Sequence, residues 1–372
     1  MSKRGNGEGT IYFSDKLNRW VGQFTAGYKQ DGSINRKTVY GKTRKEVAEK
    51  ITAKQNEVNN KIFIDKSSIT FESLARDIID RQYKSNLLKE VSYIRKLDIL
   101  RLIQKTKLAK KQIQDISISD INNTLAEFTD YSNSTINKVS ILIRYTLDNA
   151  VLNKIIASNP YNIKGAIIKP KSAKLDKKVE ALTIDEQKDF LAKLRHSNDY
   201  YKDVLLVALY SGMRIGEILA LSNKDIDLNN NVIHVRKTLT RSINDSFIVG
   251  DTTKTYSGTR DVPMLPQIRH IFSTNQNEGL IFTKNDKLIA PTTINEHFKK
   301  ICKSADINTP VNTHMLRHTF ATRCIESGMS AVVLSKILGH KNIEVTLNTY
   351  TSVFNKYKND EVDKVVQYFD AI

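Results

Sequence analysis

Residues 313–351 read THMLRHTFATRCIESGMSAVVLSKILGHKNIEVTLNTYT, and the rest of the chain is interpreted around this stretch. The residues suited to phosphoryl transfer are His314, Arg317, His340 and Tyr350, with Arg214 upstream in ALYSGMRIGEILAL. Two guanidinium groups bind a phosphodiester bidentately and stabilise the extra negative charge of its pentavalent transition state. Histidines donate hydrogen bonds to the same oxygens or move protons near neutral pH. A tyrosine hydroxyl that attacks phosphorus holds the strand covalently, so the bond energy is kept without a nucleotide cofactor.

The apolar residues that follow His314 recur at the spacing of an α-helix. They are Leu316, Phe320, Ala321 and Cys324. Such a helix places His314 and Arg317 at adjacent positions on one face. His318 lies four positions after His314, which is also a metal-ligand spacing, but no glutamate follows His314 and no third ligand is near. We therefore interpret His318 as a structural, hydrogen-bonded histidine and expect no zinc site.

A second helix is predicted to begin at Ser330, which is suited to capping a helix amino terminus, and to end at Gly339. Its residues expected to be buried are Val333, Leu334 and Ile337. His340 then begins a loop. Residues 343–350 predict a further helix, which would present Tyr350 from a movable carboxyl-terminal element.

Several fragments, in this order and spacing, resemble the tyrosine recombinase or phage-type integrase family. They are Arg-Ile-Gly-Glu at 214–217, His-Met-Leu-Arg-His at 314–318, Leu-Gly-His at 338–340 and the tyrosine at 350. Thr-Lys-Thr at 253–255, followed by Thr-Arg-Asp-Val-Pro-Met at 259–264, matches a hairpin that carries a lysine in the family. The catalytic residues implied by the resemblance are Arg214, Lys254, His314, Arg317, His340 and Tyr350. Glu217 is interpreted as a residue that orients Arg214 or its helix.

The resemblance also implies a reaction. The arginines and histidines would hold the scissile phosphate, Tyr350 would form a 3′-phosphotyrosine, and Lys254 would protonate the departing 5′ oxygen. Strand exchange with a partner duplex would then pass through a Holliday junction, with no metal or other cofactor. Two alternatives remain open: a type IB topoisomerase-like relaxing enzyme, and a DNA-binding regulator that has lost catalysis. The Leu-Gly-His loop and the layout of the amino-terminal DNA-binding regions disfavour the first, and the intact catalytic set disfavours the second.

Composition indicates a protein that binds a polyanion. The 372 residues carry a formal net charge of +18, and an apolar fraction of 40% is enough for packed cores. Cys302 and Cys324 are too few for a disulfide framework and are expected to be buried thiols. No secretory signal or membrane-spanning segment is evident, so we expect no membrane partner. The expected location is the cytoplasm of a bacterial host, on DNA.

Residues 1–65 predict a small domain with a three-stranded β-sheet and one helix. Strands are expected at about 10–13, 20–28 and 37–40, followed by a helix from Thr43. This domain resembles the arm-type DNA-binding domain of the larger integrases. Its candidate DNA-contacting residues are Arg19, Tyr28, Arg36 and Lys37. We interpret Trp20, Phe24 and Tyr40 as its small core; the alternative is that these aromatic side chains contact DNA.

Residues 66–165 have a purely helical pattern that resembles the core-binding domain of the same family. Helices are expected from Phe71 and at about 91–103, 119–128 and 134–151. The candidate phosphate contacts are Lys105, Lys107, Lys110, Lys111, Lys138 and Arg144. The alternative for each is an ordinary solvated position. Residues 166–178 are interpreted as a lysine-rich linker, and residues 179–372 as the catalytic domain.

The predicted fold class is therefore multidomain, with a small β-sheet-plus-helix domain, an all-α core-binding domain and a mainly α catalytic domain containing a small β-sheet. Residues 355–370 form an amphipathic tail whose apolar residues are Val362, Val365, Val366 and Phe369. In the family such a tail packs on a neighbouring protomer; the alternative is that it caps its own domain. The expected partners are double-stranded DNA at core and arm attachment sites, three further copies in a homotetramer, an excisionase and DNA-bending proteins. The arm-type domain indicates an integrase that integrates and excises a mobile element.

Overall fold

The computed structural model describes residues 9–28, 32–59, 64, 67–174, 180–244, 246–251, 259–274, 279–307 and 311–371. The chain divides into two compact units, Met1–Leu175 and Asp176–Ile372. The predicted catalytic Lys254 lies outside the described residues. Within the described part, no helix combines the length and apolar character that crossing a membrane requires.

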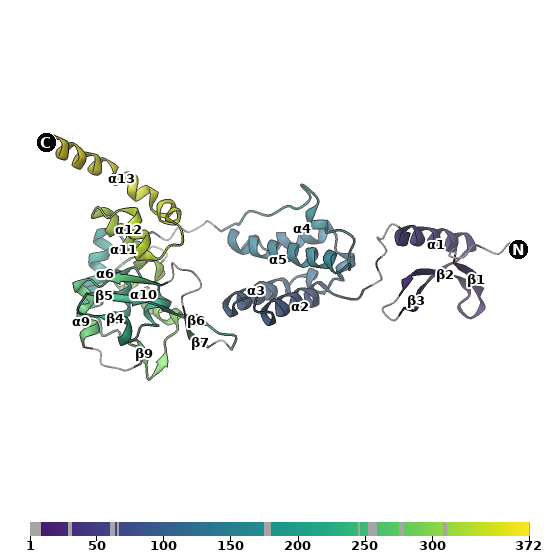
Figure 1. Cartoon of the computed structure of the whole chain (residues 1–372), viewed down its shortest axis with the longest axis horizontal. Coiled ribbons are helices and arrows are strands. Elements are labelled where there is room, and N and C mark those ends of the chain that lie inside the picture. The colour runs from purple at the N-terminus through teal and green to yellow at the C-terminus, as the bar shows by residue number, and fades with distance from the viewer. Residues whose placement is uncertain are drawn as a thin grey trace. The chain divides into compact units, whose positions relative to one another are not determined.

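The first unit begins with the predicted three-stranded antiparallel sheet and its helix (Figure 1). Their bounds are β1 Thr10–Ser14, β2 Arg19–Tyr28, β3 Ile34–Gly41 and α1 Arg44–Asn59. Phe24 on β2 packs against Val47 and Ile51 on α1, and these three side chains form a small core. Helix α1 covers this face of the sheet closely, since a methyl group added at Gly22 would lie 2.4 Å from the Val47 side chain.

The prediction that Tyr40 belongs to this small core is wrong, because its side chain is 45% exposed. Tyr40 pairs with Val21, whereas Trp20 pairs with Gly41. Side chains alternate between the two faces of a strand, so Tyr40 lies on the face opposite Trp20 and Phe24. Aromatic character alone does not reveal this difference of face.

The rest of the first unit is helical, as predicted. Its helices are α2 Phe71–Lys84, α3 Glu90–Ile103, α4 Ile118–Ala126 and α5 Asn133–Leu152. Phe71, Leu100 and Leu147 lie in their common core. Residues 166–174, which the sequence assigns to the linker, are held against the same helices: the Ala173 and Ser172 amides donate to the Thr129 carbonyl and the Asn133 side chain at 2.8 and 3.0 Å.

The second unit is mainly helical and contains a small sheet. Its helices are α6 Ile184–Arg195, α7 Lys202–Ser211, α8 Ile215–Ile218, α9 Pro266–Ser273, α10 Pro291–Ser304, α11 His314–Glu326, α12 Ala331–Leu338 and α13 Ile343–Asp370. Its strands are β4 Ile226–Asp227, β5 Val232–Val235, β6 Lys237–Arg241, β7 Phe247–Asp251, β8 Arg260–Pro263, β9 Thr283–Lys284 and β10 Lys287–Leu288. Strands β4, β5 and β8 form one sheet, and β6–β7 and β9–β10 are two-stranded. Phe190, Ile233 and Phe298 lie in one core, so sheet and helices form a single packed body. Both cysteines are buried and free, as predicted.

Helices α11 and α12 follow the predicted boundaries closely, and α13 begins where the predicted helix at 343–350 begins (Figure 1). The Ser330 hydroxyl accepts a hydrogen bond from the Val333 amide, and Gly339 ends α12 at a φ of 67°. The prediction that Val333 is buried is wrong, since it is 47% exposed. Successive helical residues are about 100° apart, and the buried face of α12 is centred on Leu334 and Leu338 instead.

The predicted helix at 343–350 and the predicted tail at 355–370 form one helix, α13, with non-helical dihedral angles at Tyr350. Val353 and Phe354 pack beside Tyr350 against α11 and α12. Val362 and Phe369 are exposed, whereas the Val365 side chain lies outside the described residues. The bend in α13 therefore falls at the tyrosine that the sequence singles out.

Gly212 allows a test of how α7 is held beside α11. It has a φ of +63°, and a methyl group there would lie 2.4 Å from the Phe320 ring. We expect Gly212→Ala to lower the free energy of unfolding by about 1–3 kcal/mol through overpacking and backbone strain, measured by urea denaturation. Gly250→Ala is the matched control, because the nearest atom there, the Thr240 hydroxyl, is 3.9 Å away. Equal stability of the two variants would contradict this account.

Candidate active site

Arg214 and Glu217 form the first part of the site, at the start of helix α8. Arg214 occupies the N-cap position, and its backbone amide donates to Glu217 Oε2 at 2.9 Å. The Arg214 guanidinium donates to Glu217 Oε1 at 2.8 Å. Glu217 therefore orients Arg214, as the sequence suggested. The Arg214 side chain is 43% exposed, so it can still contact a phosphate from solution.

Arg260, at the start of β8, holds the other side of Glu217. Its two terminal nitrogens donate to Oε1 and Oε2 at 3.1 and 2.7 Å, and its Nε donates to the Ile337 carbonyl at 2.6 Å. The side chain is only 6% exposed. Burial opposes ionisation of Glu217, but the bonds to Arg260 and the charges of Arg260 and Arg214 outweigh it and lower the pKa to about 2.

Sequence reasoning did not single out Arg260. One signal was available: Arg260 lies in the fragment 259–264 that resembles the family, directly before alternating strand residues. Among 58 lysines and arginines, however, nothing in the sequence distinguishes a buried arginine from a solvated one. The long-range pairing with Glu217, 43 positions away, becomes evident only in the fold.

Arg317 is buried one turn into α11 and joins two other helices. Its terminal nitrogens donate to the Gly212 carbonyl at 2.9 Å and to the Leu338 carbonyl at 2.7 Å. Burial, and then the nearby charge of Arg214, lower the pKa of Arg317 to about 9. The guanidinium is thus held in a low-dielectric environment, where its attraction for an anion is stronger than in water.

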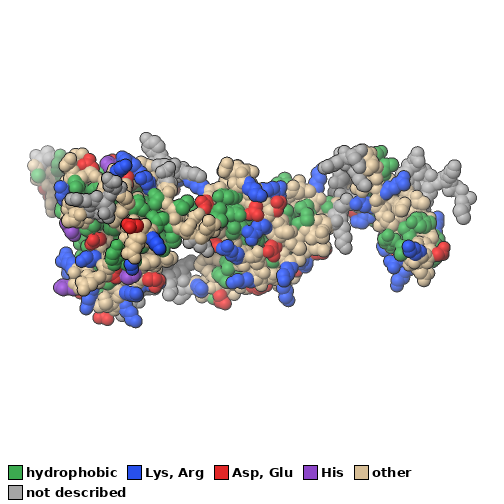
Figure 2. All heavy atoms as spheres, turned by 90° about the horizontal axis from the view of Figure 1, so that it is seen from below, with side chains coloured by type: hydrophobic (Ala, Val, Ile, Leu, Met, Phe, Trp, Pro, Cys, Tyr) green, Lys and Arg blue, Asp and Glu red, His purple; other side chains and the backbone are tan. Residues whose placement is uncertain are grey.

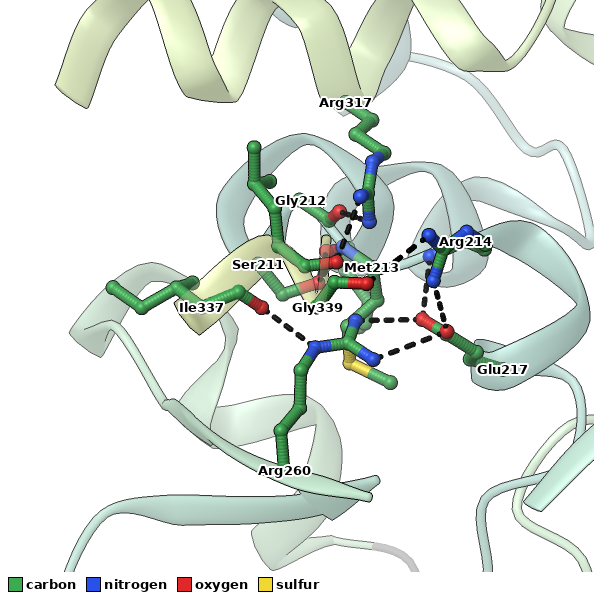
Figure 3. Close-up of polar contacts among 11 residues, drawn as sticks. Ser211, Gly212, Met213, Arg214, Glu217, Arg260, Arg317, Ile337 and Gly339 are labelled. Carbon is green, nitrogen blue, oxygen red and sulfur yellow. Dashed lines mark hydrogen bonds and ion pairs between the residues drawn. The ribbon is translucent and has the colours of Figure 1, made fainter. Parts of the chain in front are cut away.

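Three arginines converge on the carboxyl end of α12 (Figure 3). Arg260, Arg317 and Arg214 donate to the carbonyls of Ile337, Leu338 and Gly339 respectively, the last at 3.5 Å. These carbonyls lie at the negative end of the helix dipole. The helix end and Glu217 therefore offset much of the repulsion among three cations while leaving net positive charge at the site.

His340 follows directly after this helix end. Its Nδ1 lies 2.7 Å from the hydroxyl of the buried Thr346, which fixes the ring. Burial, followed by the charges of Arg317 and Arg214, lowers the pKa of His340 to about 4. His340 is therefore neutral near pH 7 and carries its ring into the cluster of arginines.

Tyr350 is docked and buried at the bend in α13, with 4% of its surface exposed. Its hydroxyl lies 3.0 Å from His318 Nδ1. Burial raises the pKa of Tyr350 to about 12, although the charge of Arg317 opposes this shift. His314 lies on the same side of α11, its ring centroid 5.8 Å from that of His318. His318 is hydrogen-bonded, as predicted, and its partner is the candidate nucleophile.

The structure thus brings five of the six predicted catalytic residues into the second unit around α11 and α12. The side chains of Arg214 and Arg317 and the backbone amide of His340 donate to carbonyls in the last turn of α12, and α11 carries His314 beside His318 and Tyr350. Across the described ranges, no group of three or more His, Cys, Asp or Glu residues is arranged to hold a metal ion. Such a cluster can bind a phosphodiester by cationic and hydrogen-bond donors, with a hydroxyl nucleophile adjacent.

The candidate DNA-contacting residues of the sheet fall on different faces. Arg19 and Arg36 are exposed on the face opposite α1, and the Arg19 guanidinium lies 5.8 Å from the centre of the Tyr40 ring. Tyr28 is almost fully exposed after an irregularity in β2. Lys37 pairs with the buried Phe24, so it lies on the face that α1 covers. The open face of the sheet combines arginine and tyrosine side chains.

The candidate contacts in the helical part of the first unit are mostly solvated. Those that are exposed are Lys105, Lys107, Lys110, Lys138 and Arg144. Lys111 is half-buried and pairs with Asp120 at 2.5 Å, and Arg144 lies 3.7 Å from Asp148. Figure 2 shows lysine and arginine side chains spread over the visible face of the chain's parts, with no single dominant patch.

Comparisons with known proteins identify the class. Residues 180–356 match the phage integrase family. A "Tyrosine recombinase XerC-like" protein of Caldanaerobacter subterraneus subsp. tengcongensis is 24% identical over 93% of this chain and 95% of its own length. The transposase from transposon Tn916 of Enterococcus faecalis is 26% identical over 68% of this chain and 67% of its own.

Solved structures share the fold. The Tn1549 transposon integrase, in complex with a circular intermediate DNA, has a TM-score of 0.65 and 21% identity, covering 79% of this chain and 100% of that one. A lambda integrase tetramer bound to a Holliday junction has a TM-score of 0.59 and 16% identity, covering 93% and 96%. The predicted fold class is thereby confirmed.

The matched region and the relatives indicate an enzyme of the tyrosine recombinase class. Residues 180–356 form a domain of the phage integrase family, and the chain resembles a tyrosine recombinase over 93% of its length.

The buried Glu217 carboxylate allows a first test of the site. We expect Arg260→Met to lower the free energy of unfolding by about 3–5 kcal/mol, because it removes one partner from a buried ion pair. Adding Glu217→Leu should recover much of that loss, since the buried carboxylate, which keeps only Arg214 as a partner in Arg260→Met, is then absent. Arg269→Met is the control, because Arg269 also donates to a carbonyl but is exposed. Urea denaturation measures all four proteins, and a loss at Arg260 no larger than at Arg269 would contradict the pairing.

His340 allows a test by pH. Its native pKa is about 4 and its unfolded value is near 6.5, so the unfolded chain binds more protons between these pH values. The contribution of His340 to the free energy of unfolding should therefore be complete above pH 6.5 and should be lost progressively as the pH is lowered towards 4. His340→Asn should flatten part of this slope, measured by urea denaturation from pH 4.5 to 7.5. The same slope in variant and wild type would show that His340 is not held neutral.

Proposed function

We propose that this protein is a site-specific integrase that cleaves and rejoins DNA to integrate and excise a mobile element. The observation that carries the proposal is the convergence of Arg214, Arg317 and His340 at one helix end beside the docked Tyr350. Similarity to a transposon transposase and to integrases solved on DNA supports the kind of substrate. The reaction needs no metal or nucleotide, because the tyrosyl ester conserves the bond energy.

In the proposed reaction Arg214 and Arg317 bind the non-bridging oxygens of the scissile phosphate, and His314 and His340 donate hydrogen bonds to them. The buried Arg317 supplies charge that is already oriented before DNA arrives, which lowers the cost of stabilising the transition state. Tyr350 attacks phosphorus and becomes a 3′-phosphotyrosine, while Lys254 protonates the departing 5′ oxygen. The 5′ hydroxyl of a partner duplex then attacks the tyrosyl ester, and two such exchanges proceed through a Holliday junction.

Four copies of the chain would act together on two duplexes. The exposed Val362 and Phe369 on α13 offer an apolar surface that a neighbouring protomer would cover, in keeping with the tail exchange suggested by the sequence. A lambda integrase tetramer bound to a Holliday junction, with the same fold, supports this arrangement. The helical part of the first unit would contact the core site, and the open face of the β-sheet would contact arm sites through Arg19 and Arg36.

We further propose that excisionase and DNA-bending proteins set the direction of the reaction. Separate arm and core contacts on one chain support this, because bent DNA would be needed for both to be occupied at once. The protein would act in the cytoplasm of a bacterial host. The arm-type domain favours the integrase of a phage or integrative conjugative element over a chromosome-dimer resolvase or a simple inverting enzyme.

Covalent capture tests the proposal directly. The purified protein is incubated with sheared, nicked DNA from its own element and host, the mixture is digested, and DNA that stays attached after denaturation is sequenced. We expect attachment at one recurrent sequence, which would be the core site. Tyr350→Phe, which removes only the hydroxyl, should bind DNA with unchanged affinity and give no attachment.

The outcomes separate the possible functions. If the wild type binds DNA without covalent attachment, the proposal of an integrase is rejected, and the protein is a DNA-binding regulator without catalysis. Attachment without any strand exchange between duplexes, accompanied by relaxation of supercoils, would indicate a topoisomerase-like enzyme. Attachment that persists in Tyr350→Phe would assign the nucleophile elsewhere.

A further inference from the structure

We propose that His318 is a further catalytic residue, which holds the Tyr350 hydroxyl through Nδ1 and accepts its proton when the oxygen attacks phosphorus. This inference rests on the proposed function, because it takes Tyr350 as the nucleophile. It assigns to His318 a chemical role that exceeds the structural role expected from its sequence position.

The contact between the two side chains is the first argument. Tyr350 Oη and His318 Nδ1 are 3.0 Å apart, within the range of a hydrogen bond along which a proton moves. Their ring centroids are 5.7 Å apart with the planes inclined at 58°, so the two rings lie against each other between α11 and α13. The contact joins residues 32 positions apart, and Tyr350 is packed in a small core with Ala321 and Leu338.

The protonation state of His318 favours acceptance of a proton. Burial, followed by the charge of the adjacent Arg317, lowers the pKa of His318 below its usual value. The ring is therefore neutral near pH 7, and in the tautomer with hydrogen on Nε2 its Nδ1 accepts the phenolic hydrogen. The groups near this pair are Arg317 and His314 on α11, Cys324 about two turns further along α11, and His340 after α12.

Two of the groups nearby, Arg317 and His340, are less suited to take this proton. Arg317 has no acceptor atom and remains cationic. His340 directs Nδ1 to the Thr346 hydroxyl at 2.7 Å, and its pKa of about 4 makes it a weak base. A buried phenol whose pKa is about 12 attacks slowly unless a base accepts its proton during the step. His318 already lies at hydrogen-bond distance from that phenol.

The proposed step is balanced. A bond forms between Tyr350 Oη and phosphorus, and the bond from phosphorus to the 5′ oxygen breaks. The phenolic proton moves to His318 Nδ1, and the departing 5′ oxygen takes a proton from Lys254. In the reverse step, the 5′ oxygen of the partner strand forms a bond to phosphorus and gives its proton to the neutral Lys254, the bond between phosphorus and Tyr350 Oη breaks, and His318 returns its proton to the tyrosine oxygen.

Sulfur substitution at the leaving group separates this role from leaving-group protonation. The substrate is a nicked duplex of the sequence that the wild type attaches to, made with either oxygen or sulfur at the scissile 5′ position. A thiolate leaves without a proton, so loss of the acid is bypassed but loss of the base is not. Single-turnover covalent attachment is measured for wild type, His318→Ala, His318→Asn and Lys254→Ala. Circular dichroism and DNA binding confirm that each variant is folded.

We expect His318→Ala and His318→Asn to slow attachment about 10²- to 10⁴-fold on both substrates, whereas sulfur should restore most of the loss in Lys254→Ala. Asparagine is the informative replacement, because its side-chain oxygen can accept a hydrogen bond near the Nδ1 position but does not take up a proton. His297→Asn is the matched control: it removes another half-buried histidine, 2.6 Å from Asp199, and should leave the rate unchanged.

Several results would overturn the inference. A wild-type rate in His318→Asn would mean that holding the hydroxyl is sufficient. Restoration of either His318 variant by sulfur would place its action on the leaving group. An unchanged rate in folded His318→Ala would mean that the contact between His318 and Tyr350 belongs to the protein before reaction and has no part in the chemical step. If the wild type itself does not become attached to DNA, the proposed function is rejected, and this inference with it. That result is seen before any variant is compared.

Discussion

The site depends on one constraint, which is that three guanidinium groups converge on the carboxyl end of a single helix. Arg214, Arg260 and Arg317 come from three different elements, and each donates to one of three successive carbonyls at the carboxyl end of α12. Like charges this close would repel strongly in a buried environment. The helix dipole and the buried Glu217 supply the compensating negative charge, so the arrangement is held in place before any phosphate binds.

The three arginines have different roles in this arrangement. Arg260 is buried, and each of its three guanidinium nitrogens donates to Glu217 or to the Ile337 carbonyl. It therefore holds neighbouring groups in position. Arg214 is the exposed member, and Arg317 presents its charge from a buried position. Tyr350 lies at the bend of α13, where local departure from helical geometry lets its side chain dock beside α11. Reaction on DNA would then require the scissile phosphate to bind within reach of the hydroxyl of this docked tyrosine.

Much of the fold and of the candidate site could be predicted from sequence, because the catalytic fragments are short, ordered and bounded by strong helix signals. Ser330 and Gly339 act on their own helix, and local chemistry decides such boundaries. The predictions that Val333 and Tyr40 are buried are wrong because the helical period and the strand register, rather than residue type, decide which face is buried. Arg260 and the partner of His318 could not be foreseen, since both depend on contacts between elements distant in sequence.

In the proposed reaction, Tyr350 becomes joined to DNA at the site built around α12. The most direct measurement is tandem mass spectrometry of the adduct after protease and nuclease digestion. The account predicts a peptide that contains Tyr350 and carries one nucleotide through its 3′ phosphate, with fragment ions that place the added mass on that tyrosine. A nucleotide joined through a 5′ phosphate, or attached to any other residue, would contradict it.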